Sequence, residues 1–196
     1  MNVRLFSSLL VLALAPLAVA QEDNPYKNVK VGDFAVYKMT TKIAGMAIDG
    51  TVVQTITDKT DKEATIKVVA KVLGQEVPRE DKIDLTKPYD PTKAASLPPG
   101  TEAKIEKLKD GTEKIKVGDK TYDAKWESYN MKAKAQGQEF EATFKVWNSK
   151  EFPLYLLKME MQAKVAGMDM EMGMEVTESG NKPVEKKAAE KTPEKK

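Results

Sequence analysis

Apolar and polar residues alternate almost without interruption over Met159–Val176, MEMQAKVAGMDMEMGMEV. Side chains on a β-strand point alternately to its two faces, so this pattern predicts two strands that are apolar on one face and charged on the other. With Ala166-Gly167 as a two-residue turn, Met161 faces Met172 across the strands. The stretch therefore predicts a β-hairpin with methionines on one face of a sheet.

The same design recurs around glycines that follow a lysine by three positions, in the form K-x-x-G-[M/Q]-x-apolar. The repeats begin at Lys42, Lys71, Lys134 and Lys164. A glycine at the second position of a two-residue loop supplies the positive φ that a tight hairpin turn requires. The predicted turns are Ala44-Gly45, Leu73-Gly74, Gln136-Gly137 and Ala166-Gly167. Gene duplication and convergence of short β repeats would both explain these hairpins.

A proline and two further turn signals indicate the limits of other predicted strands. Gln75–Leu85 contains Pro78, which cannot donate to a central ladder, so this stretch is predicted as an edge or bulged strand. Asp110-Gly111 and Gly118-Asp119 are turn signals. They are predicted to divide the chain around them into three short strands, Ala103–Leu108, Glu113–Val117 and Thr121–Trp126.

The pattern as a whole predicts about ten strands and no helix of normal length. An antiparallel sheet with one apolar face must bury that face, and no helices are available to cover it. The predicted fold is therefore all-β: a curled antiparallel meander, either half-barrel or barrel, with an internal hairpin repeat. A two-layer sandwich is the remaining arrangement.

The N-terminus differs from this β-rich body. Arg4 precedes the apolar run Leu9–Leu14, and Ala18-Val19-Ala20 forms a small-x-small cleavage pattern. These features predict a secretory signal peptide over residues 1–20, with an apolar run too short to anchor the chain in a bilayer. The protein is therefore predicted to be exported, to a periplasmic or extracellular location, with no transmembrane segment after cleavage.

The rest of the chain is predicted as one β domain over residues 21–180. Its halves, about 31–86 and 101–180, are joined by the proline-rich stretch 87–100. Residues 181–196 contain lysine, glutamate, alanine and proline without apolar periodicity, which predicts a disordered tail.

Composition narrows the function. The 196 residues include no cysteine and no histidine, so no disulfide can form and most acid–base and nucleophilic catalytic arrangements are absent. We therefore expect no enzyme and no cofactor. The formal net charge of +2 includes the basic tail, and the nearly neutral body has no electrostatic footprint for nucleic acid.

The apolar face is the candidate binding surface. Small residues at the centre of a curled sheet leave space, and methionine fills irregular space adaptably. The candidate ligand-binding residues are Met39, Met131, Phe140, Phe144, Met161, Met170 and Met172. They predict an exported binding protein that holds a lipid, an acyl chain or an envelope partner on its concave face. The alternative is a structural or interaction scaffold of the cell envelope, with a filled core.

A third interpretation concerns copper. Thioethers are soft ligands that select Cu(I), and the sulfurs of directly opposed methionines could reach one ion. The candidate pairs are Met159 with Met174 and Met161 with Met172. Because no histidine or cysteine supports them, this is a minor alternative.

Trp147 precedes Pro153-Leu154 in a Trp-x-x-x-x-x-Pro-Leu stretch that joins two predicted strands. In an exported chain with a single-faced meander, this stretch resembles the outer-membrane lipoprotein-carrier superfamily. The resemblance implies an incomplete β-barrel that holds acyl chains on its concave face. The helices that cover the barrel in those carriers have no counterpart in this sequence. Trp126 and Trp147 fall on the outer face, where they either pack under another segment or mark a partner or carbohydrate surface.

Overall fold

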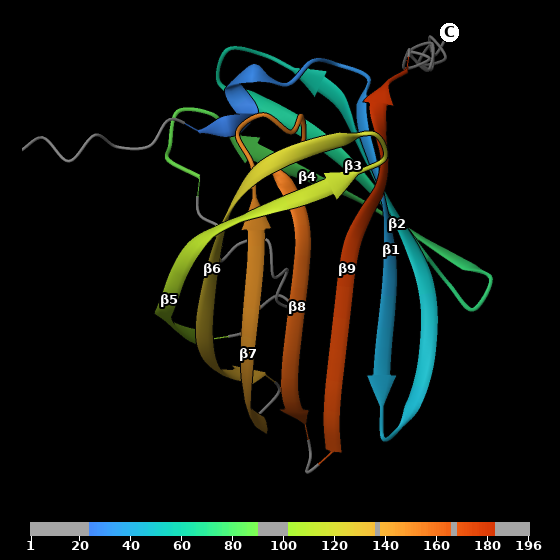
Figure 1. The fold of residues 1–196 in the computed structure, drawn as a ribbon, viewed down its shortest axis with the longest axis vertical. Coiled ribbons are helices and arrows are strands. Elements are labelled where there is room, and N and C mark those ends of the chain that lie inside the picture. The colour runs from blue at the N-terminus through green and yellow to red at the C-terminus, as the bar shows by residue number, and fades with distance from the viewer. Residues whose placement is uncertain (1–23, 90–101, 136–137, 166–167, 183–196) are drawn as a thin grey trace, which may run out of the picture.

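Among the residues that the structure describes, a single antiparallel sheet of nine strands accounts for almost all of the regular structure (Figure 1). The computed structural model describes residues 24–89, 102–135, 138–165 and 168–182, so the predicted signal peptide and nearly all of the predicted tail lie outside these residues. The strands are β1 (Asp33–Ile43), β2 (Met46–Lys59), β3 (Glu63–Val72), β4 (Gln75–Asp84), β5 (Glu102–Val117), β6 (Lys120–Ala135), β7 (Gln138–Asn148), β8 (Leu156–Val165) and β9 (Met168–Asn181). A short 3₁₀ helix, η1 (Pro25–Asn28), precedes them.

The strand order is β4-β3-β2-β1-β9-β8-β7-β6-β5. Two meanders, β1–β4 and β5–β9, are therefore joined by the pairing of the first strand with the last. The sheet is curled and open, with β4 and β5 as its two edges (Figure 1). The all-β curled fold is confirmed in its half-barrel form, and the prediction that Gln75–Leu85 is an edge strand is confirmed by β4.

The hairpin turns lie where the repeat predicts them. Ile43 pairs with Met46 around Ala44-Gly45. Ala44 and Gly45 have φ of 49° and 84°, the two positive values that a type I′ turn needs. The turn at Leu73-Gly74 has the same form, with φ of 51° and 78°.

The other two repeat turns, 136–137 and 166–167, lie outside the described residues, but the strands that flank them are paired as predicted. Ala135 pairs with Gln138, and Val165 pairs with Met168. Asn181, the first residue of the predicted tail, still belongs to β9 and pairs with Asp33.

The prediction of a turn at Asp110-Gly111 is wrong, because β5 continues through both residues. Gly111 pairs with Trp126, and a Cβ atom at Gly111 would lie 2.7 Å from Cζ2 of the Trp126 ring. The glycine is therefore needed because a side chain there would clash with the indole ring; it does not mark a turn. The chain reverses at Gly118-Asp119, as predicted, so the three predicted strands become parts of two long ones.

The far half of the β5–β6 hairpin crosses β8 and reaches β9 (Figure 1). There it covers outward-facing side chains: the Trp147 indole Nε1 donates a 2.9 Å hydrogen bond to Glu113 Oε2 of β5. Tyr122 of β6 meets Phe152 edge to face, at 5.5 Å between ring centroids. Trp147 is only 4% exposed. It therefore packs under another segment, as one of the two interpretations predicted, and does not form a partner or carbohydrate surface.

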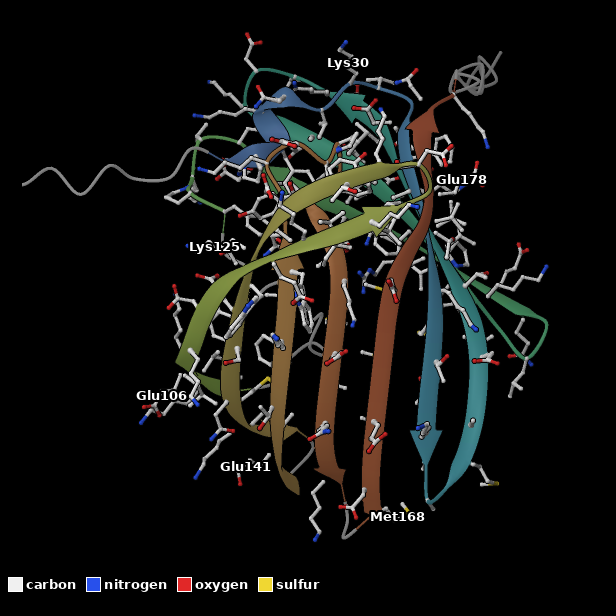
Figure 2. The ribbon with its side chains drawn as sticks, viewed as in Figure 1. Lys30, Glu106, Lys125, Glu141, Met168 and Glu178 are labelled. Carbon is white, nitrogen blue, oxygen red and sulfur yellow. The ribbon has the colours of Figure 1, made fainter. Side chains whose placement is uncertain are left out.

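The inside of the curl holds the core. Apolar side chains at alternate positions of the strands are buried, with charged side chains such as Glu106 and Glu141 projecting from the outer side (Figure 2). On β6, β7 and β8 the buried inward positions are Tyr129, Met131, Ala133, Ala142, Phe144, Val146, Met159 and Ala163. No helix among the described residues is long and apolar enough to cross a membrane.

Candidate functional site

The six predicted ligand-binding residues whose side chains the structure describes lie on the inner face, where they pack against the core. Met131 and Phe144 are 2% and 1% exposed, and the Phe144 ring stacks on Tyr129 at 5.0 Å between centroids. Met39, Met161, Met170 and Met172 are partly buried against the same cluster. Phe140 of β7 pairs with Ala133 of β6, but the Phe140 side chain is outside the part of the chain that the structure describes.

The methionine pairs proposed for copper are opposed as predicted. Met159 pairs with Met174, and Met161 pairs with Met172. Met159 and Met174 are 6% and 9% exposed, so this pair forms part of the packed interior.

A cavity of about 380 Å³ opens elsewhere on the inner side, between β3, β4 and the opposite wall of the curl. It is lined by Asn24, Tyr26, Gln54, Ile66, Val68, Arg79, Asp81, Lys82, Ile83, Asp84, Lys87, Pro88, Tyr89, Leu156 and Met174. Of the methionines singled out in the sequence, Met174 alone belongs to this lining.

The inner wall of the cavity is apolar because inward positions of several strands converge there. Ile66 and Val68 of β3, Leu156 of β8 and Met174 of β9 all line the space. Behind them, the Tyr37 hydroxyl donates a 2.9 Å hydrogen bond to the Leu156 carbonyl. Burial raises the pKa of the Tyr37 phenol, so this group stays a neutral donor.

An aromatic group closes one side of the cavity. Tyr89, at the start of the proline-rich connection, lies 5.5 Å from Tyr26 and 5.0 Å from Tyr155 between ring centroids. The Asn24 side chain donates to the backbone carbonyls of Asp84 and Lys87 at 3.1 and 3.0 Å. Asn24 therefore fixes the end of β4 and the residues after it against η1. Residues 90–100 of the predicted connection lie outside the described residues.

The opposite side of the cavity is a charged rim carried by β4 and the residues that follow it. Three ion pairs lie along it: Arg79 with Asp81 at 2.8 Å, Lys82 with Glu63 at 2.8 Å, and Lys87 with Asp84 at 2.9 Å. Hydrogen bonds from the Thr86 side chain and from Lys87 to Asp84 lower the pKa of that carboxyl to about 2. The cavity thus has an apolar wall and a charged edge.

Sequence reasoning missed this cavity because it followed the most regular alternation. The signal lay in the irregular strand: Arg79 and Asp81 occupy positions of β4 opposite Val68 and Ile66, where the pattern calls for apolar side chains. A break in alternation on an edge strand marks a place where the interior is not filled with apolar side chains.

No protein-family model matches this chain, and no curated protein matches it closely. Among solved structures, a Bacteroides fragilis protein described as exported, with a YmcC-like fold, aligns with a TM-score of 0.51. That match covers 78% of this chain and 97% of the other, at 9% identity. A Parabacteroides distasonis protein described as a lipoprotein aligns with a TM-score of 0.50 over 77% of this chain and 96% of its own length, at 12% identity.

At such identities the two matches show a shared fold. The class that they define is a curled, open β-sheet found in proteins described as exported or as lipoproteins. Neither is described as a lipoprotein carrier, so the resemblance to that superfamily stays a prediction.

Proposed function

We propose that this protein is an exported, non-enzymatic binding protein that takes an apolar ligand, a lipid or an acyl chain, into the cavity beside β4. The observation that carries the proposal is the cavity itself. Its volume of about 380 Å³ falls within the range of roughly 300–1,000 Å³ that is usual for small-molecule sites. A scaffold protein would need no such space.

The chemistry of the lining supports binding over catalysis. Ile66, Val68 and Leu156 offer an apolar wall with no titratable group. The rim carboxylates of Asp81 and Asp84 are held in ion pairs with Arg79 and Lys87. Contacts from Thr86 and Lys87 also lower the pKa of Asp84, which makes this carboxylate poorly suited to proton transfer. Export is supported by the predicted signal peptide and agrees with the descriptions of the two structural neighbours.

Native mass spectrometry of residues 21–196, purified from an exporting host, tests the proposal. We expect an added lipid-sized mass that disappears on solvent extraction. Val68→Phe should abolish it, because the larger side chain fills the space beside Ile66. Val53→Phe is the matched control, since Val53 lies on the other face of β2 from the core residue Val52.

A mass that stays that of the bare chain after incubation with lipids would overturn the proposal and favour the filled scaffold. A copper-sized increment after incubation with Cu(I), without any lipid mass, would instead favour the opposed methionine pairs. Equal lipid loss in Val53→Phe and Val68→Phe would place the ligand outside the cavity.

A further inference from the structure

Two inward positions of β4 carry charged side chains beside the cavity. The register pairs Arg79 with Val68 and Asp81 with Ile66, so all four side chains share one face of the sheet. Arg79 and Asp81 both line the cavity. The ligand that enters this space therefore meets a charged pair on its wall as well as apolar side chains.

Arg79 is also chemically singular in the chain. After the predicted signal peptide, every other basic residue is a lysine. Lysine and arginine carry the same charge, but the planar guanidinium presents its N–H donors as a fork that matches the two oxygens of a carboxylate or phosphate. Where positive charge alone is needed, this protein uses lysine.

The geometry of Arg79 leaves part of that fork open. Its Nε donates to Asp81 Oδ2 at 2.8 Å, and Nη2 lies 2.8 Å from the same oxygen. These contacts occupy one edge of the guanidinium. Nη1 has no hydrogen-bond partner among the residues that the structure describes. Since the side chain is 48% exposed, the second edge is accessible.

We propose that the cavity takes an amphiphile with an anionic oxygen headgroup, a carboxylate or a phosphate, and that Arg79 binds this headgroup. The inference rests on the proposed function and adds the chemistry of the headgroup. The apolar chain lies against Ile66, Val68 and Leu156, and the headgroup lies at β4. Lys82 and Lys87 add positive charge to the same lining, where Asp81 and Asp84 are the acidic residues.

A rival explanation exists for a charge on the inner face of an edge strand. Such charges discourage one sheet edge from pairing with another, and β4 is an edge. That role requires no ligand and predicts no preference among headgroups. The two explanations therefore differ in a measurable way.

Titration calorimetry with three matched probes separates them: dodecanoate, dodecyl phosphate and dodecanol, each below the concentration at which it forms micelles. Because hydrogen bonds to charged groups are stronger than neutral ones, we expect the two anions to bind on the order of 10- to 100-fold tighter than the alcohol. Arg79→Gln should remove this preference and leave dodecanol binding unchanged. Lys67→Gln, on the outer face of β3 opposite Glu80, should keep the preference and serves as the charge-matched control.

Equal binding of acid and alcohol by the unaltered protein would overturn the role of Arg79 while leaving the proposed function intact. Binding of none of the three chains would overturn the proposed function itself. Inorganic phosphate supplies the last comparison. If it binds as tightly as dodecyl phosphate, the site recognises a free anion, and the proposal that the ligand is an amphiphile is wrong.

Discussion

The two sides of the inner face differ in how completely they are filled. Around β7, β8 and β9, the Phe144 ring stacks on Tyr129 and is 1% exposed. Around β3 and β4, a space of about 380 Å³ remains beside Ile66 and Val68. Both sides carry apolar side chains on the same face of one sheet. Alternation therefore identifies the face that turns inward, but it does not reveal whether the space in front of that face is occupied.

The cross-strand partners explain the difference. In the filled region, large residues lie beside small ones: Phe144 pairs with Met161, and the neighbouring inward pair is Ala142 with Ala163. Such neighbours interdigitate closely. On the cavity side, the partners that β4 offers to Ile66 and Val68 are charged, and a charged side chain keeps its head near water.

The largest expected effect comes from truncating the filled side. Phe144→Ala should lower the free energy of unfolding by about 3–5 kcal/mol, because its neighbours cannot close the hole. Val68→Ala should cost roughly 1–2 kcal/mol, since it only enlarges a space that already exists. Urea unfolding followed by circular dichroism measures both. Equal losses at the two positions would contradict the contrast between the regions.

A smaller effect is expected where the two sides meet. Tyr37 of β1 is fully buried and donates its hydroxyl hydrogen bond to the Leu156 carbonyl beside the cavity. Tyr37→Phe leaves that carbonyl without this donor and should cost about 1–2 kcal/mol in the same unfolding experiment. Tyr122→Phe is the control, because the Tyr122 hydroxyl makes no hydrogen bond to a described residue and its ring keeps its contact with Phe152. A larger loss for Tyr122→Phe than for Tyr37→Phe would refute this account.

The smallest effect concerns pH at the cavity rim. The pKa of Asp84 is lowered from 3.8 to about 2 by the Thr86 and Lys87 contacts. The carboxylate therefore stabilises the rim above pH 4, and this contribution is lost as the pH falls from about 4 to 2. An NMR titration of the Asp84 carboxyl carbon should show a midpoint of about 2, and Thr86→Val should move it upward. A midpoint near 3.8 in the unaltered protein would contradict the hydrogen bonding described.

Local sequence pattern was enough to predict the hairpins and their register. Two-residue loops fix which residues face each other, so Met161 opposite Met172 could be predicted from the turn alone. The Asp110-Gly111 prediction failed because the reason for the glycine, the Trp126 ring on the neighbouring strand, is a tertiary contact. The cavity was missed for a related reason: its walls come from strands distant in sequence, and no local pattern reports their separation.

The pairing of β1 with β9 has a consequence for the order in which the chain can become native. Phe34 pairs with Gly180, so the centre of the sheet is completed by β9, the last of the described strands in chain order. Until β9 is available, β2 is the only neighbour of β1 among the described strands, and closing so long a loop is a slow, entropically costly step. A polypeptide that crosses a membrane N-terminus first thus cannot complete its sheet before the segment around Gly180 has passed. The topology itself makes completion of the sheet depend on the segment around Gly180.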